Sequence, residues 1–368
     1  MVNTIKFKNY KLFKSWQTLK IKPMTVLIGK NSSGKSAILK LPTLIQGSLS
    51  GNFPEPLRWR SDGIELGGEF KDLIYGRNPL GQLEFILNSE EDKLEVVVSH
   101  FEGIPKIFFW KYNDKEIIEP SEEDFNGFIC KLDFLNNLSL TTEYISSLRL
   151  GLERYFDKSP QKFSRVGLFG EHVYQILIED ALTTPQDLVR QVSEFYKLNF
   201  EGWGLSINKD TPPYIIRLES DDLRINIKDV GLGMVHTLPL VARACMKAEN
   251  EILICIEEPE LHLHPGAHGN LAELFVKSLK DNNKKYFIET HSQNFILRLR
   301  ALVAEGKLNS EDLAIYYVDY DEERNESNLE PITVNEQGEV DYWPENIFSE
   351  SLYETIRIRK AQKQESMR

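Results

Sequence analysis

The chain has 368 residues, of which 41% are hydrophobic and 27% are charged, and its net charge is −12 at pH 7. These values are typical of a globular protein with one large domain or two small ones. The sequence also excludes a chain built of membrane spans, because no apolar run approaches the roughly 20 residues that a span needs. Three scattered cysteines exclude a disulfide framework. The lysine-rich start lacks the apolar segment of a secretory signal, so we expect a cytoplasmic protein that does not contact a membrane.

The charge is unevenly distributed along the chain. Residues 1–54 contain nine lysines and no acidic residue, so the remainder carries −21. A protein that is acidic as a whole is not expected to coat nucleic acid in general. The lysines between Lys6 and Lys22 could still form a local DNA or RNA surface, or they could simply be solvated, and composition leaves both interpretations open.

Residues 1–120 are predicted to form a lobe with antiparallel strands. Alternation over Ile5–Leu12 predicts the first strand of a pair, and Met24–Ile28 reads as a short buried strand. A helix from about Lys35 to Gln46 follows a glycine and serine loop, and Pro42 should kink or shorten it. Three further runs predict a strand meander: Leu83–Leu87, Leu94–Val98 and Lys106–Trp110.

The middle of the chain, residues 121–212, turns more helical. An amphipathic helix is predicted over Asp180–Tyr196, so we expect an inserted, mainly helical arm or lid. Residues 213–318 return to alternating strands and helices, which is typical of an α/β fold with a parallel sheet. Residues 319–368 form a C-terminal extension, whose last part, Ser349–Arg368, reads as a basic helix or a frayed end.

One loop carries a phosphate-binding pattern between the strand Met24–Ile28 and the helix after it. Glycines let backbone N–H groups turn toward phosphates, and the helix N-terminus adds a positive dipole end. Lys35 is expected to reach the β- and γ-phosphates of ATP, and the Ser36 hydroxyl to ligate Mg²⁺. The pattern G-x-x-x-x-G-K-S is formed by Gly29, Lys30, Asn31, Ser32, Ser33, Gly34, Lys35 and Ser36.

A second apolar strand, Ile252–Ile256, runs directly into two carboxylates. This order is typical of a Walker B strand. Glu257 is expected to hold Mg²⁺ through a water molecule, and Glu258 to orient or deprotonate the attacking water. An exposed acidic strand end would be the alternative, but the phosphate loop upstream favours the catalytic interpretation.

Five of the seven histidines lie between residues 236 and 291. The spacing of His262, His264 and His268 permits a zinc site, but no cysteine accompanies them and Pro265 interrupts the helical register that such a site would use. His291 is different, because it follows the predicted strand Tyr286–Glu289 beside the other two active strands. We expect it to contact the γ-phosphate.

These motifs together resemble a known group. A Walker A loop, a strand ending in Glu-Glu-Pro-Glu-Leu-His-Leu-His-Pro (257–265), and Glu-Thr-His-Ser (289–292) are similar to prokaryotic ABC-type ATPases of the RecF, SMC-head and OLD kind. Weaker patches, among them Gln46-Gly47-Ser48, extend the resemblance over nearly the whole chain. It implies an α/β ABC-type head with an inserted helical arm, and a head-to-tail homodimer around two ATP molecules with Mg²⁺. A higher oligomer built from such dimers is left open.

The resemblance also implies roles for individual residues. A signature segment, Asp229–Pro239, would contact the partner's γ-phosphate through Gly231 and Gly233. The group usually has Ser-Gln where this chain has Val235-His236, and because valine cannot donate a hydrogen bond, we expect slow hydrolysis. Gln46 matches the subfamily and is a further candidate for the Mg²⁺ site.

Several functions fit this sequence. The first is a slow ATPase that switches a nucleic-acid-linked or effector complex, with a neighbour-encoded nuclease or toxin as partner, as the resemblance to phage-defence systems implies. The alternative is an ATP sensor or scaffold that does not hydrolyse ATP. A third is an ATP-coupled nuclease using the acidic run Asp319–Glu323, although too few residues follow Ser292 for a Toprim module. A transporter ATPase is less favoured, because its usual signature is absent.

Overall fold

The structure is a computed structural model of the whole chain. It describes residues 1–61, 63–78, 80–101, 104–118, 124–131, 138–149, 151, 153–183, 186–209, 212–344, 347–348, 355–359 and 362. The expectation for Ser349–Arg368 lies largely outside the described residues; of this stretch, residues 355–359 and residue 362 are described, and they are helical.

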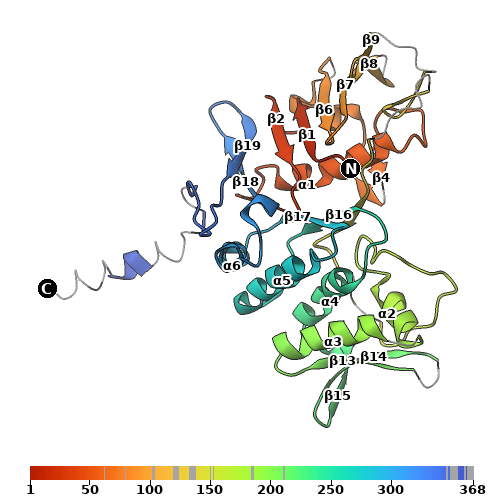
Figure 1. The fold of residues 1–368 in the computed structure, drawn as a ribbon, viewed down its shortest axis with the longest axis vertical. Coiled ribbons are helices and arrows are strands. Elements are labelled where there is room, and N and C mark those ends of the chain that lie inside the picture. Colours follow the sequence, from red (N-terminus) through yellow and green to blue (C-terminus); the bar gives the residue numbers. More distant parts are fainter. Residues whose placement is uncertain are drawn as a thin grey trace.

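A six-stranded sheet forms the centre of the molecule (Figure 1). Its strands are parallel except for the last pair, in which β18 and β19 form an antiparallel hairpin. The predicted strands at residues 24, 252, 286 and 313 all belong to it, which confirms the α/β fold. From one edge to the other the strands are β12 (Thr142–Ile145), β16 (Ile252–Glu257), β17 (Lys284–Glu289), β3 (Met24–Gly29), β18 (Leu313–Asp321) and β19 (Glu326–Ile332).

The central sheet separates two hydrophobic cores, because alternate side chains of each strand point to opposite faces. In β16, Ile252, Ile254 and Ile256 enter one core, while Leu253 and Cys255 enter the other. By the same alternation, the side chain of the last residue of β16 points to the second core. A sheet buried on both faces explains why its strands read as continuous apolar runs rather than as alternating ones.

The helices of the second half of the chain cover the first face. These helices are α4 (Leu232–Cys245), α5 (Pro265–Ser278) and α6 (Gln293–Ala304), and all three pack in the first core. The expected helices at residues 233, 266 and 293 are confirmed, and each begins within one residue of its predicted start. Ser292 accepts a hydrogen bond from the Phe295 N–H at 3.1 Å and so caps α6.

The second face packs against α1 (Lys35–Leu49) and an antiparallel sheet. Pro42 lies inside α1 but does not end it, so the helix is longer than predicted. Two small pairs, β4 (Arg60–Ser61) with β5 (Ile64–Glu65) and β10 (Phe125–Asn126) with β11 (Ile129–Cys130), lie in the connections. The antiparallel sheet has the order β2 (Gln17–Lys20), β1 (Thr4–Lys8), β6 (Leu83–Asn88), β7 (Lys93–Phe101), β8 (Ile104–Tyr112) and β9 (Lys115–Ile118).

The arm differs from the expected helical insertion at 121–212. It consists of α2 (Val173–Ala181), α3 (Asp187–Asn199) and a three-stranded sheet of β13 (Gly204–Asn208), β14 (Ile215–Ser220) and β15 (Leu223–Asn226), at one end of the molecule in Figure 1. Moreover, β12 lies within this range but belongs to the central sheet. The single helix expected over Asp180–Tyr196 is two helices, and the Asp180 carboxylate accepts a hydrogen bond from the Val189 N–H in the first turn of α3.

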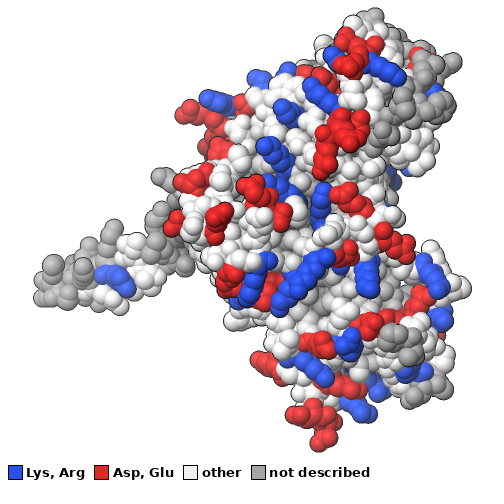
Figure 2. Space-filling view, in the orientation of Figure 1, with Lys and Arg blue, Asp and Glu red and all other residues white. Residues whose placement is uncertain are grey.

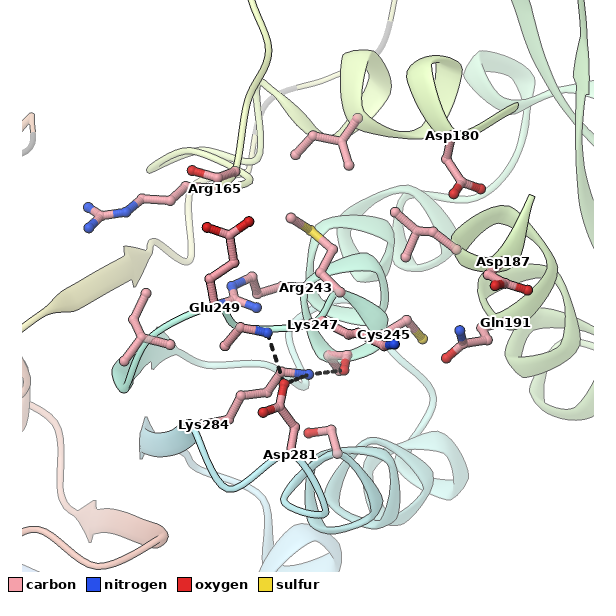
Figure 3. A pocket seen from close by; sticks show the side chains of 18 of the residues that line it. Arg165, Asp180, Asp187, Gln191, Arg243, Cys245, Lys247, Glu249, Asp281 and Lys284 are labelled. Atoms are coloured by element: carbon pink, nitrogen blue, oxygen red, sulfur yellow. Dashed lines mark hydrogen bonds and ion pairs between the residues drawn. The ribbon is translucent and has the colours of Figure 1, made fainter. Parts of the chain in front are cut away.

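A cavity of about 1250 Å³ lies where the arm meets the central sheet (Figure 3). Its lining includes Thr141 and Ile252, so it opens at the amino ends of β12 and β16. Figure 3 also shows Lys284 in the lining of the cavity. The Lys284 Nζ donates to the Ala244 carbonyl oxygen at 2.9 Å. The phosphate loop, Glu258 and His291 lie at the opposite, carboxyl edge of the sheet, after β3, β16 and β17. Within the described ranges, no helix is both long enough and apolar enough to cross a membrane.

Candidate nucleotide site

The phosphate loop between β3 and α1 has a backbone that requires glycine at two positions. Gly29 has φ +152°, and a Cβ there would lie 2.4 Å from the Val318 carbonyl oxygen of the neighbouring strand. Gly34 has φ +104° and lies against the Phe13 ring. The first turn of α1 contains no acidic residue, so its positive dipole end is available to an anion. The loop predicted from Gly29 to Ser36 therefore lies at a strand end and a helix start, as phosphate binding requires.

Lys35 and Ser36 begin α1, and their side chains approach the end of β17. Lys35 is buried, and its Nζ donates to the carbonyl oxygens of Gly29 at 3.0 Å and Lys30 at 2.7 Å. Burial lowers the pKa of Lys35, while the nearby Glu289 and Glu258 carboxylates oppose this shift. The Ser36 Oγ donates to Glu289 Oε1 at 3.1 Å.

Glu257, at the end of β16, is held by residues in the last part of β12 and directly after it. Its Oε1 accepts a hydrogen bond from the Tyr144 hydroxyl and lies 3.9 Å from Lys40 Nζ. Its Oε2 accepts from the Ser146 Oγ at 3.0 Å, and from the Ser147 N–H at 3.0 Å and Oγ at 3.1 Å. Burial raises the pKa of Glu257, but the hydrogen bonds from Tyr144 and Ser147 outweigh burial and hold it below its usual value.

Glu258 and His291 face each other at the carboxyl ends of β16 and β17. The His291 Nε2 lies 4.0 Å from Glu258 Oε1, and both side chains are about one-third exposed, at 37% and 35%. Burial, followed by the positive charge of Lys35, lowers the pKa of His291, so the imidazole is neutral at pH 7. Glu258 has φ +40°, a left-handed conformation that is unusual outside glycine and is often found at functional sites.

Two residues below this pair were not assigned a role from the sequence. Glu260 is buried, and its Oε1 accepts from the His291 N–H at 2.6 Å. Arg149 is also buried, and its Nη2 donates to the carbonyl oxygens of Glu257 at 2.7 Å and Glu258 at 3.1 Å. Burial lowers the pKa of Arg149 to about 10 and raises that of Glu260. These contacts fix the backbone that carries Glu258 and His291. The motif at residues 257–265 contains Glu260 but does not indicate this contact, and only the fold brings Arg149 to this backbone.

The segment expected to contact a partner's phosphate starts α4. Gly231 precedes the helix and is exposed, with no atom within 4 Å of the position that a Cβ would take among the described residues. Gly233 has a packing reason, because a Cβ there would lie 2.5 Å from the His262 carbonyl oxygen. Val235 is only 4% exposed and packs in the first core. A side chain at this position points inward, so the structure does not support the expectation that valine here slows hydrolysis by replacing a donor to the phosphate.

Gln46 does not approach the phosphate loop. Its Oε1 accepts a hydrogen bond from the Thr142 N–H at the start of β12. Ten residues separate it from Ser36 along α1, which corresponds to about 15 Å at the helical rise of 1.5 Å per residue. An ion bound to Ser36 is therefore beyond its reach, and the expectation that Gln46 helps to hold Mg²⁺ is wrong.

The other candidate metal residues have structural partners. The ring nitrogens of His268 lie 2.7 Å from the Ser292 Oγ and 3.1 Å from the Leu263 carbonyl oxygen. Asp321 Oδ1 accepts from the N–H groups of Glu323 and Arg324 and so closes the β18–β19 turn. In the part of the chain that the structure describes, no group of three or more His, Cys, Asp or Glu residues could hold a metal ion.

The residues around the phosphate loop fit ATP with Mg²⁺. Two buried polar atoms near Lys35 and Ser36 have no hydrogen-bond partner among the described residues. They are Ser33 Oγ and Glu289 Oε2. Buried polar groups are normally paired, so unpaired ones at a strand-to-helix loop indicate a ligand that completes them. Lys35, the loop N–H groups and the dipole of α1 suit phosphates, and Ser36 with the neighbouring carboxylates suits a hard divalent cation.

The lysines of the first segment do not form a continuous free basic surface. Lys8 forms an ion pair with Glu84 at 2.8 Å, Lys22 Nζ lies 3.7 Å from Glu311, and Lys11 donates to the Leu66 carbonyl oxygen. On the face shown in Figure 2, basic and acidic side chains are intermixed. This distribution gives no support to nucleic acid over a protein partner.

Comparison with known proteins agrees with this geometry. Residues 24–298 match the family described as "AAA domain, putative AbiEii toxin, Type IV TA system", and residues 308–357 match "Protein of unknown function (DUF3696)". Among curated proteins, none matches the chain.

Two solved SMC heads share the fold. The SMC head bound to the C-winged helix domain of ScpA is 13% identical, with a TM-score of 0.50 over 91% of this chain and 98% of that chain. The Smc head with an extended coiled coil from Pyrococcus furiosus, bound to the C-terminal domain of ScpA, is 12% identical, with a TM-score of 0.52 over 98% and 99%. The first family model alone covers most of the chain, which therefore belongs to this AAA family and has the fold of an ABC-type P-loop ATPase head.

Proposed function

We propose that this protein binds and hydrolyses ATP with Mg²⁺ in a head-to-tail dimer, and that ATP-gated dimerisation switches a nucleic-acid-linked or effector complex. The observation that carries the proposal is the pair formed by Glu258 and His291, which stand 4.0 Å apart next to the phosphate loop. A carboxylate and a neutral imidazole at the ends of neighbouring strands suit the orientation of a water and the contact with a γ-phosphate.

Each residue has a distinct part in this reaction. Lys35 exchanges its bonds to the loop carbonyls for the phosphate oxygens, and the loop N–H groups hold the remaining phosphate charge. Bound Mg²⁺ would neutralise the phosphate charge, with Ser36 and a strand-end carboxylate on its side of the site. Glu258 takes a proton from the attacking water, and Arg149 keeps Glu258 in position through its backbone.

The exposed start of α4 supports the dimer. Among the described residues, no side chain caps α4 at Gly231, and the helix dipole favours an anion at this exposed end. In a head-to-tail dimer this helix start would meet the phosphate held by the partner's loop. ATP would then act as part of the interface, which explains how its binding and hydrolysis could open and close a complex.

The family description names a toxin of a toxin–antitoxin system, and because such a system has two components, this supports a second protein that works with the chain. The proposed role in phage defence rests on the motif resemblance alone. The two SMC heads are bound to domains of ScpA, and this supports a protein partner for a head of this fold. A neighbour-encoded nuclease or toxin is the partner that we propose to test.

The test is steady-state ATP hydrolysis by the purified protein, with the Glu258→Gln variant as the control for contaminating enzymes. Glu336, an exposed glutamate, provides a matched control as Glu336→Gln. We expect turnover in the wild type and in Glu336→Gln, and loss of at least 100-fold in Glu258→Gln. Equal turnover in all three would contradict the proposal. ATP binding without turnover would instead favour the sensor that does not hydrolyse ATP.

A further inference from the structure

Glu289 is the last residue of β17 and lies between two functional strands. In the sheet register it is paired with Glu257 of β16 on one side and with Leu27 of β3 on the other. Because Phe287 enters the second core, Glu289 points to the same face, where α1 starts. The Glu289 side chain is therefore directed toward Ser36, although 253 residues separate the two in the sequence.

The contacts of Glu289 leave part of its carboxylate unused. Oε1 accepts from Ser36 Oγ at 3.1 Å and lies 4.0 Å from Lys35 Nζ. Oε2 has no hydrogen-bond partner within the described ranges, and the residue is only 4% exposed. A buried carboxylate in this state needs further positive charge or a further donor. When Lys35 turns to the phosphates, the Glu289 carboxylate loses a nearby positive charge, and the cost of leaving it buried increases.

The carboxylate of Glu257, in contrast, has all its hydrogen-bonding positions occupied. Its two oxygens accept four hydrogen bonds, from Tyr144, Ser146 and both donors of Ser147. A carboxylate has about four lone-pair positions, so Glu257 is already satisfied by the protein. To bind an ion, Glu257 would have to give up hydrogen bonds to the segment Tyr144–Ser147.

We propose that Glu289, rather than Glu257, is the carboxylate that positions the Mg²⁺ of the bound nucleotide. This inference rests on the proposed function. Glu289 accepts the hydrogen bond of the Ser36 hydroxyl, which leaves the Ser36 lone pairs free for the ion, and its carboxylate places negative charge beside that ion. Glu257 instead holds the segment Tyr144–Ser147 against the end of β16. Glu289 is thus a positioning residue for Ser36 and for the ion.

The experiment measures binding of the fluorescent analogue trinitrophenyl-ATP with Mg²⁺ and with EDTA. The ratio of the two dissociation constants gives the enhancement due to Mg²⁺. We expect Glu289→Gln to reduce this enhancement at least tenfold while binding in EDTA is unchanged or tighter, because a negative charge near the phosphates is gone. Glu257→Gln and Glu336→Gln should keep the enhancement. Glu289→Asp should restore part of it, which a purely structural role would not produce.

A second readout does not depend on fluorescence. Binding of Mn²⁺ to the ATP complex, followed by electron paramagnetic resonance, should weaken in Glu289→Gln and not in Glu257→Gln. Full enhancement in Glu289→Gln, or equal loss in both variants, would overturn the inference. If Glu289→Gln melts far below the wild type, Glu289→Asp is used in its place. In that case, a Mg²⁺ enhancement in Glu289→Asp as low as that of a Ser36→Ala variant would also overturn the inference. If the wild type itself binds no ATP, the proposed function fails first.

Discussion

Ser327 donates its hydroxyl to the carbonyl oxygen of Ser33 at 2.7 Å, across 294 residues of sequence. Ser327 lies on β19, in the part of the chain matched by the second family model, and Ser33 lies in the phosphate loop matched by the first. Both residues are buried. The C-terminal hairpin therefore contacts the phosphate loop directly, so the two matched segments pack together at this loop.

The first prediction concerns this contact. Ser327→Ala removes one buried hydrogen bond and leaves the Ser33 carbonyl oxygen unpaired, so we expect a loss of about 1 kcal/mol in unfolding free energy and a several-fold weaker ATP affinity. Urea unfolding and nucleotide titration measure the two effects. Ser278→Ala is a control at a site away from the loop, because the Ser278 hydroxyl bonds the Phe275 carbonyl oxygen at 2.8 Å and the Tyr286 hydroxyl at 2.6 Å, so its loss should lower stability without changing ATP affinity. Loss of ATP affinity in both variants would show that the effect is not specific to the loop.

The second prediction distinguishes two lysines of the phosphate loop. Lys35→Ala should weaken ATP binding by about 10- to 100-fold, since charge-assisted hydrogen bonds contribute about 1.5–3 kcal/mol. Lys30 is exposed and contributes its backbone, so Lys30→Ala should bind ATP almost as well as the wild type. Isothermal titration calorimetry with ATP measures both. Equal weakening by the two substitutions would contradict the role given to Lys35.

The third prediction follows from the buried Glu289. Burial raises the pKa of Glu289 to about 7, above the value of 4.5 expected in the unfolded chain. A group with a raised folded pKa gives stability that is present below pH 4.5 and is lost as pH rises through 7. The loss is about 3 kcal/mol at most, from 1.36 kcal/mol per pH unit.

Glu289→Gln should remove this dependence in the nucleotide-free protein. Relative to the wild type, its unfolding free energy should increase by up to about 3 kcal/mol between pH 5 and pH 8. Urea unfolding at the two pH values measures the difference, and Glu336→Gln should follow the wild type. A difference between variant and wild type that does not change with pH would contradict the raised pKa.

The fourth prediction concerns a buried ion pair that joins the central sheet to the arm side of the molecule. Arg243 Nε on α4 donates to Glu143 Oε2 on β12, and the Glu143 Oε1 accepts from the Val166 N–H at 2.8 Å. Arg243→Met leaves the Glu143 charge buried and should cost about 3–5 kcal/mol. Arg190→Met, which breaks only exposed ion pairs, should change stability little. Similar melting temperatures for the two variants would count against this reading.

Local sequence patterns predicted much of the central sheet. The phosphate loop was predictable because its glycines, its strand and its helix are consecutive, so one segment contains all the information. The same holds for β16, which ends at the expected carboxylate, and for β17, which His291 follows two residues after its end.

The parts that were missed depend on distant partners. The strand β12 is only four residues long and contains the buried Glu143, whose charge is balanced by Arg243, 100 residues later in the sequence. No periodicity reveals such a strand. Gln46 was assigned to the metal from a weak pattern, but its helix carries it to Thr142 instead. The unused carboxylate of Glu289 likewise appears only when β17 and α1 are in place.

The most direct test of the account is the molar mass of Glu258→Gln in solution, measured by light scattering with and without ATP and Mg²⁺. If ATP closes a head-to-tail dimer and Glu258 drives its hydrolysis, this variant should be a monomer without ATP and a stable dimer with it. Adding Lys35→Ala to the variant should abolish the dimer. A monomer at saturating ATP, or a dimer of the same stability in the absence of ATP, would contradict the ATP-gated switch.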